Sequence, residues 1–292
     1  MVYQFIQEYS KSYPVNLLCK TMGISRSSYY DFRAGHTFQP SQARLEVSAQ
    51  VKMVFDSNRR RYGSRRIKED LKRRGIKIGR YQVSSSMRAQ NLIAIQPKSF
   101  VPKTTNSNHT LGYSPNVLAR QGFPTGIGQV YVGDITYLPT TNGEWLYLMV
   151  WMDLFSRRIC GWKVEEHMEE SLVIDALMQA FKKRFPAKGL ITHSDRGGQF
   201  ASVKYRALLE KYDCVQSMSE ADNPYDNAFA ESFFSRFKAE LLQKGVFESR
   251  EDAVVELFDF IEMYYNTHRL HSSLGYQSPM EYEESLNQIN LL

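Results

Sequence analysis

The sequence QVYVGDITYL, residues 129–138, reads as a β-strand that contains an aspartate, Asp134. Valine, isoleucine, threonine and tyrosine favour strands, whereas aspartate is a poor strand residue. A buried carboxylate without a partner is also costly. Some feature of the surroundings must therefore compensate for Asp134.

Regular elements follow this strand in an order typical of an α/β fold. Asn142-Gly143 predicts a hairpin turn after it. The expected strands are 129–138, 144–153, 158–164, 189–193 and 215–217, and the expected helices are 171–185, 203–212 and 227–242. Three antiparallel strands followed by alternating helices and strands are compatible with a ribonuclease-H-like core, a mixed five-stranded sheet with helices.

Two further acids lie on other elements of this fold. Asp195 follows the strand GLITHS, at the end where α/β sheets commonly present functional side chains. Glu231 lies on the helix NAFAESFFSRFKAELL, on the same side as Lys238 two turns later. The core-facing stripe of that helix is predicted to be Ala230, Phe233, Phe237 and Leu241.

Each acid taken alone has an ordinary alternative. Asp195 could close a turn, and Glu231 could be a solvent-facing helix residue. However, 60 residues lie between Asp134 and Asp195, and 35 lie between Asp195 and Glu231. This spacing favours one shared site over three unrelated carboxylates.

The spacing and four motifs, in the same order, closely resemble the OrfB-type insertion-sequence transposases of bacteria, relatives of retroviral integrases with a D, D, 35-spaced E core. The motifs are GDITYL (133–138), HSDRGGQF (193–200), NAFAESFFSRFK (227–238) and YNTHRLHSSLGYQSPMEYE (265–283). The resemblance extends over nearly the whole chain, starting from FIQEYSKSYPVNLLCKTMGISRSSYYDFR. Unlike the retroviral relatives, the chain lacks an amino-terminal His/His/Cys/Cys zinc module, so recognition of DNA ends would rest on helix-turn-helix segments.

The resemblance implies a catalytic metal-binding triad of Asp134, Asp195 and Glu231, with Lys238 contacting DNA near the cleavage site. It implies nicking at the terminal inverted repeats of a mobile element, followed by attack of the freed 3′ hydroxyl on target DNA. A homo-oligomer on DNA, a circular intermediate, and fusion to or association with a smaller upstream-frame protein are also implied.

The chemistry of phosphodiester cleavage explains why acids of this kind are needed. Two divalent ions about 3.5–4 Å apart can activate the attacking oxygen and stabilise the leaving oxygen. Carboxylate oxygens suit Mg²⁺, with Mn²⁺ as a substitute, whereas histidine and cysteine clusters would indicate zinc. We therefore expect two Mg²⁺ ions per active site.

Basic residues are concentrated in the first third of the chain. Residues 1–103 hold 20 lysines and arginines against 6 acids, whereas residues 104–292 hold 17 against 25. Such a basic front region predicts a grip on nucleic acid rather than a merely solvated surface. The expected domains are a DNA-binding region (1–93), a proline-rich linker (94–127), the core (128–245) and a short carboxy-terminal helical segment (246–292).

The DNA-binding region is predicted to be all-α and to contain two helix-turn-helix patterns. In residues 14–35, Gly23 marks the turn, Ser25 caps the next helix, and the apolar set is Val15, Leu17, Leu18 and Met22. The second helix would present Arg26, Ser27 and Tyr30 to a major groove.

Residues 62–92 repeat this pattern with more basic residues. Ser64 is predicted to cap a helix with Ile67 and Leu71 inward, and Gly75 to end it. The residues expected to face DNA are Arg65, Arg66, Lys68, Lys72 and Arg73, followed by Ser84, Ser85, Ser86 and Arg88 on the next helix.

The sequence also bears on location. The first ten residues do not have the order of a signal peptide, and the longest apolar stretch, residues 145–152, ends at Asp153. Three widely spaced cysteines are expected to be reduced and buried. We expect a cytoplasmic, nucleoid-associated bacterial protein without a membrane segment.

Several residues have two open interpretations. His193 either approaches the reacting phosphate or ends its strand, and Asn227 either caps its helix or touches DNA. Arg269 and His271 either contact DNA or pack against the core. Asp153 is interpreted as structural, together with Ser156 and Arg157.

Two other functions are weighed against transposition. One is a repressor with a decayed core, which the intact acids and Lys238 disfavour. The other is a nuclease that only hydrolyses, which the basic arm disfavours.

Overall fold

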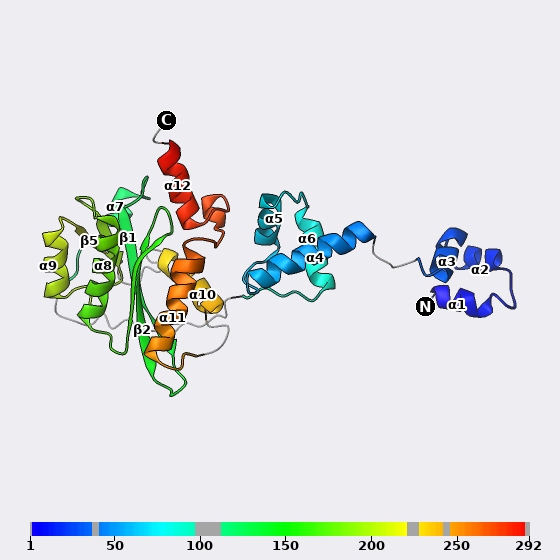
Figure 1. The fold of residues 1–292 in the computed structure, drawn as a ribbon, viewed down its shortest axis with the longest axis horizontal. Coiled ribbons are helices and arrows are strands. Elements are labelled where there is room, and N and C mark those ends of the chain that lie inside the picture. Colours follow the sequence, from blue (N-terminus) through cyan, green and yellow to red (C-terminus); the bar gives the residue numbers. More distant parts are fainter. Residues whose placement is uncertain (1, 37–40, 97–111, 221–227, 242–245, 290–292) are drawn as a thin grey trace. The chain divides into compact units, whose positions relative to one another are not determined.

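The computed structural model describes residues 2–36, 41–96, 112–220, 228–241 and 246–289, leaving out the side chains of 228–233 and 289. Contacts divide the chain into two compact units, Met1–Ala94 and Ile95–Leu292 (Figure 1). We call them the helical unit and the sheet unit, and we treat each by itself.

The helical unit begins with α1 (Val2–Tyr9), α2 (Val15–Thr21) and α3 (Arg26–Arg33), packed around Ile6, Cys19 and Tyr29. The predicted turn is confirmed, because Gly23 has a φ of +64° that suits glycine, and the Ser25 hydroxyl accepts a hydrogen bond from the Ser28 amide. Of the predicted apolar set, Leu17 and Met22 are exposed, because the short α2 can turn only one side toward its neighbours.

The second half of the helical unit consists of α4 (Gln42–Ser57), α5 (Ser64–Arg73) and α6 (Arg80–Ala89), which pack on one another. Ile67 and Leu71 are buried as predicted. The cap of α5 is Gly63, and Ser64 is already helical. The expectation that Ser86 is available to DNA is wrong, since it is buried and lies 2.9 Å from the Ser48 hydroxyl.

The sheet unit confirms the predicted mixed five-stranded sheet. Its strands are β1 (Val130–Pro139), β2 (Trp145–Asp153), β3 (Ile159–Glu165), β4 (Ile191–Ser194) and β5 (Val215–Met218). They lie in the order β3-β2-β1-β4-β5. The first three are antiparallel, and β4 and β5 run parallel to β1.

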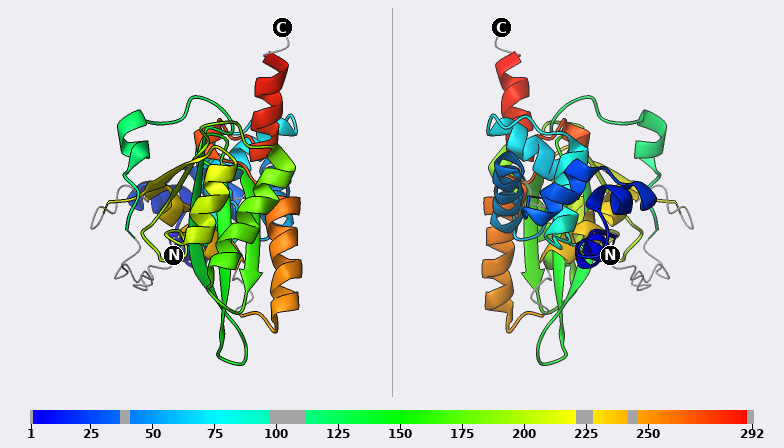
Figure 2. Two further views of the ribbon diagram at one scale, coloured as in Figure 1. Left: turned by 90° about the vertical axis from the view of Figure 1, so that its left-hand side faces the viewer. Right: turned by 90° about the vertical axis from the view of Figure 1, so that its right-hand side faces the viewer.

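Helices cover both faces of this sheet (Figure 2). One face packs against α8 (Glu170–Arg184) and α9 (Val203–Lys211), and the other against α10 (Ala228–Leu241), α11 (Arg250–Phe258) and the π-helix η2 (Asp259–Tyr265). Strand β2 therefore alternates, with Leu148 and Val150 on the α11 side and Met149 and Trp151 on the α8 side.

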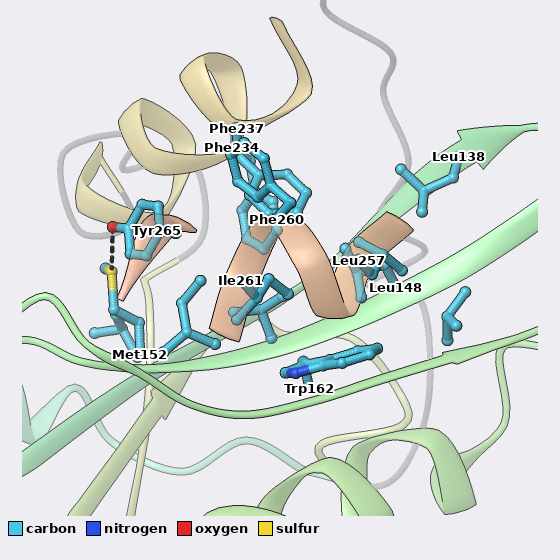
Figure 3. Packing of buried hydrophobic residues seen from close by; sticks show 14 of the residues in the cluster. Leu138, Leu148, Met152, Trp162, Phe234, Phe237, Leu257, Phe260, Ile261 and Tyr265 are labelled. Carbon is cyan, nitrogen blue, oxygen red and sulfur yellow. Dashed lines mark hydrogen bonds between the residues drawn. The ribbon is translucent and has the colours of Figure 1, made fainter. Parts of the chain in front are cut away.

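The segment after residue 246 is part of this core rather than an appended tail. Phe247, Leu257, Phe260 and Tyr265 pack with side chains of the sheet and of α10 (Figure 3). The chain then continues through a 3₁₀ turn, η3 (Ser272–Leu274), and α12 (Pro279–Ile289). The sequence alone shows a helical stripe here but not the surface that the stripe covers.

The end of the expected linker is also tied to the sheet. Residues 117–121 form α7 (Val117–Gln121), and the Ser217 hydroxyl of β5 accepts hydrogen bonds from the amides of Val117 and Leu118 at 3.0 and 3.2 Å. The linker predicted over 94–127 is therefore ordered structure from residue 112 onward, and residues 97–111 lie outside the described part.

Two further sequence predictions concern the cysteines and membrane insertion. All three cysteines are free, with Cys19 and Cys160 buried and Cys214 half-buried. Over the described ranges, no helix combines the length and the apolar character that a bilayer crossing requires.

Candidate active site

Asp134 lies in the central strand on the side that faces α10. Val130 and Val132, which share its alternation along β1, pack in the cluster formed with α10 and α11. Its Oδ1 accepts a hydrogen bond from the Ile135 amide at 2.9 Å. The neighbouring Gly133 is required by space, because a Cβ there would lie 2.5 Å from the Trp151 ring.

Asp195 lies next to Asp134 through the parallel pairing of β1 and β4. Val132 is paired with His193 in register, and each aspartate comes two residues after its member of that pair. The Asp195 Oδ1 accepts a hydrogen bond from the Gly197 amide at 3.0 Å, which orients the carboxylate. Both aspartates are half-buried.

Tyr137 lies within electrostatic range of both carboxylates, although its place in β1 puts its side chain on the other, α8 face of the sheet, against Tyr147. Its pKa is raised first by burial, then by Tyr147, and then by the negative charges of Asp195 and Asp134. Its hydroxyl lies 3.9 Å from the Met168 sulfur. This residue was not predicted from the sequence, because Tyr147 and Asp195, which affect it, lie on other segments of the fold.

Helix α10 brings a cation to the same site. Lys238 is half-buried, and burial lowers its pKa while the charge of Asp134 raises it. Position 231 lies on α10 seven residues earlier, but the side chain of Glu231 is outside the described part. Among the described side chains, which do not include Glu231, no three His, Cys, Asp or Glu residues form a group that could hold a metal ion.

The predicted core stripe of α10 is correct in part. Phe237 is buried and Leu241 packs partly against the core. Phe234, which was not predicted, is also buried. The side chains of Ala230 and Phe233 lie outside the described part.

Asp153 has the structural role that we predicted. It is fully buried, and its carboxylate accepts hydrogen bonds from the amides of Gly128 at 2.7 Å and Ser156 at 3.0 Å. Its carboxylate is paired with the Arg184 guanidinium of α8 at 3.4 Å, and the Arg157 amide donates a hydrogen bond to its carbonyl at 2.9 Å. Burial raises its pKa, and these contacts lower it only in part.

Two residues with open interpretations are built into the core. His193 is buried, with Nδ1 2.9 Å from the Ser217 hydroxyl, which supports its structural reading. Arg269 is 4% exposed, and its guanidinium donates two hydrogen bonds to Glu240, at 2.8 and 2.7 Å. A third donation reaches His271, also buried. This geometry supports packing rather than the DNA contact assigned to Arg269.

The other predicted DNA contacts lie in the helical unit. Arg26, Arg65 and Arg88 are exposed. Arg66 is half-buried, with Nη1 donating to the Arg61 carbonyl at 3.3 Å and the guanidinium 5.5 Å from the centre of the Tyr62 ring. Asn227 lies outside the described residues.

Comparisons with known proteins find matches for the core and for the helical region that precedes it. Residues 124–224 and 212–279 match models of an integrase core domain, and residues 42–100 match an HTH-like domain. The transposase for insertion sequence element IS904 of Lactococcus lactis is 39% identical over 249 residues, covering 84% of this chain and 98% of that protein. The chain belongs to the IS3-family insertion-sequence transposases.

Other relatives extend the match over almost the full length. Transposase InsF for insertion sequence IS3A of Escherichia coli is 35% identical over 285 residues, covering 97% of this chain and 98% of that protein. Among solved structures, the HTLV-2 integrase catalytic core domain in complex with magnesium is 15% identical, with a TM-score of 0.41, and covers 53% of this chain and 96% of that one.

The class of reaction follows from the family. This transposase acts on insertion-sequence elements through an integrase catalytic core, which makes it a DDE polynucleotidyl transferase. The order of its elements, a helical HTH region followed by the mixed sheet, is the order that the sequence predicted.

Proposed function

We propose that this transposase nicks the ends of its element and joins the freed 3′ hydroxyl to another DNA strand, with Asp134, Asp195 and Glu231 as the active-site carboxylates. The observation that carries the proposal is the pairing of β1 with β4. Asp134 on β1 and Asp195 directly after β4 each come two residues beyond the Val132–His193 pair of these neighbouring strands.

The donor set fits a hard divalent cation. Two half-buried carboxylates near each other repel, and a cation between them would relieve that repulsion. Asp134, Asp195 and Glu231 would hold two Mg²⁺ ions, which supply charge stabilisation and activate the attacking oxygen. The magnesium in the HTLV-2 integrase structure is consistent with this choice.

The remaining groups of the site would act on the DNA. The Lys238 ammonium would attract a phosphate to the side of β1 that carries Asp134, because its charge lies near that carboxylate. The backbone bond from Gly197 would keep Asp195 in a fixed orientation. Both effects reduce the reorganisation required when the reaction begins.

Recognition of the element ends is assigned to the helical unit. Exposed Arg26, Arg65 and Arg88 would contact phosphates or base edges of the terminal inverted repeats. On DNA the protein would act as a homo-oligomer that also captures target DNA, alone or with a smaller upstream-frame protein. We place this activity at the bacterial nucleoid.

Labelled element ends test the proposal directly. The purified protein is incubated with these ends and Mg²⁺, and the products are separated by size. Joined products are expected, with Mn²⁺ also active and Ca²⁺ allowing binding with little chemistry. Binding without cleavage would indicate a repressor, and hydrolysis without joining would indicate a nuclease. Full activity in excess chelator would refute the metal mechanism.

A further inference from the structure

We propose that the buried Glu240–Arg269 ion pair is a positioning device that fixes the rotation of α10, and thereby the placement of Lys238 relative to Asp134. The inference rests on the proposed function, because it assumes that Lys238 and Asp134 act together. It assigns a role to Arg269 that does not involve contact with DNA.

The pair joins two parts of the chain that are far apart in sequence. Glu240 lies near the end of α10, and Arg269 lies just after η2. Their side chains are 7% and 5% exposed. Two hydrogen bonds, Nε to Oε2 and Nη2 to Oε1, connect them in the two-armed geometry that restricts both partners.

Arg269 is itself held from other sides. Its guanidinium donates to the His271 ring at 3.2 Å and lies 5.5 Å from the centre of the Tyr265 ring. Burial by itself would lower the pKa of Arg269, but the charge and hydrogen bonds of Glu240 raise it on balance. Arg269 is thus a fixed cation against which Glu240 is aligned.

The helical repeat places this contact opposite the site. At about 100° per residue, positions 231 and 238 lie on nearly the same side of α10, whereas position 240 lies on the other side. Lys238 interacts with Asp134, which agrees with this geometry. A change at Glu240 can therefore rotate the helix without touching the site.

Apolar packing alone leaves this rotation less well defined. Phe237 meets Phe260 of η2 edge to face, with ring centres 4.9 Å apart, and Phe234 packs beside it (Figure 3). Such contacts fix the distance between helices, but they tolerate small rotations better than a two-armed ion pair does. A rotation of about 10° moves a side-chain tip by about 1 Å, and such an error can cost about 100-fold in rate.

The use of an ion pair at this contact is better explained by a role in positioning α10 than by a gain in folding stability. A buried pair often adds little net stability compared with apolar residues of similar volume, whereas breaking it by removing one partner is strongly destabilising. A second buried pair provides a matched control. Glu283 of α12 accepts hydrogen bonds from Arg158 and Arg184, and none of these residues belongs to α10.

The test compares Glu240→Gln with Glu283→Gln in the full-length protein. Both changes preserve shape and break a buried arginine pair, so both should lower the melting temperature. At a temperature where both remain folded, only Glu240→Gln should slow strand transfer at saturating DNA, by about 10- to 100-fold. Only Glu240→Gln should speed hydrogen exchange in α10 while α8 stays protected. Equal losses of rate and equal exchange in the two variants would overturn the proposal.

A double variant, Glu240→Leu with Arg269→Met, separates position from stability. Removing both charges should restore much of the melting temperature, yet strand transfer should stay slow and α10 exchange fast. Wild-type rates and protection in this double variant would also overturn the proposal. If the wild-type protein joins no DNA, the proposed function fails, while the exchange of α10 still reports on the ion pair.

Discussion

Three arginines of the helical unit and two of the sheet unit occupy opposite environments. Arg26, Arg65 and Arg88 are exposed on α3, α5 and α6. Arg184 and Arg269 have side chains that are 13% and 5% exposed, and each meets a carboxylate. The same side chain is therefore exposed at three positions of one unit and joins segments through ion pairs in the other.

This contrast supports our proposal that DNA affinity and chemistry depend on different units. A charge that is paired and buried adds little to the field that attracts DNA. An exposed arginine adds to that field but contributes little to folding stability. Substitutions that range from buried to exposed side chains can test whether DNA affinity and chemistry depend on different units.

The largest effect is expected for Asp195→Asn, which removes an active-site carboxylate from the sheet unit. Loss of a metal ligand should cost several kcal/mol of transition-state stabilisation, or about 1,000-fold or more in cleavage and joining. DNA binding and melting temperature should stay near wild type, because relief of carboxylate repulsion offsets the lost ligand. Binding lost together with activity would contradict the separation of the units.

Glu283→Gln tests how much the buried ion pairs of the sheet unit contribute to folding stability. It leaves Arg184 and Arg158 without their shared carboxylate, so we expect a loss of about 3–5 kcal/mol in unfolding free energy at pH 7. Burial would raise the pKa of Glu283, but its hydrogen bond to Arg184 and the charge of Arg184 lower it on balance below 4.5.

The pH dependence of that loss has a defined sign. A carboxyl with a lowered folded-state pKa stabilises above its unfolded value, and this contribution disappears as pH falls through the folded value. The difference between wild type and Glu283→Gln in urea unfolding should therefore shrink below a pH of about 4.5. A constant difference down to pH 3 would show that the loss is one of packing.

Lys238 is intermediate between the exposed and the buried cations, because it is half-buried and close enough to Asp134 to interact with its charge. Lys238→Ala should reduce strand transfer by about 100-fold, as expected when one electrostatic contact to the reacting group is lost. The melting temperature should change little. Lys238→Arg should recover only part of the rate, because a planar guanidinium does not replace a compact ammonium. Wild-type rates in the alanine variant would make Lys238 an ordinary surface residue.

The smallest effect is expected for Arg65→Ala on the exposed side. If Arg65 contacts one phosphate, the log–log salt slope of DNA binding should fall by about 0.9. Arg66→Ala should also weaken binding but lower stability slightly, since Arg66 contacts the Arg61 carbonyl and the Tyr62 ring. Lys52→Ala is the control, because Lys52 is exposed and paired with Asp56 at 2.8 Å. An equal change of slope for Lys52 would remove the special role of Arg65.

Local patterns predicted the strands and helices of the core to within a few residues. The strand expected at 129–138 is observed at Val130–Pro139, and the helix expected at 227–242 is observed at Ala228–Leu241. The strand period of two residues and the helix period of about 3.6 residues depend only on residues close in sequence. They can therefore be recognised without knowing which element packs against the segment. The carboxylate spacing, read together with the motifs, led to Asp134 and Asp195 in the same way.

Arg269 shows what local patterns leave open. In sequence it lies in a polar segment, THRLHSS, for which both DNA contact and packing against the core were open interpretations. Its environment depends on Glu240, which lies 29 residues earlier, and on the packing of η2. Tyr137 was missed for a similar reason, because the charges around it come from β4 as well as from its own strand.

By itself, the sequence determined the family and the order of the elements, because these follow from residue type and local spacing. Only the tertiary structure decided which of the predicted DNA-contacting charges are exposed and which are buried in ion pairs inside the fold. Arg65 and Arg269 have the same guanidinium, but one lies on an exposed helix and the other between α10 and the segment after η2. Burial and pairing with residues far away in sequence decide the role of a charged side chain. Neither can be inferred from its neighbours along the chain.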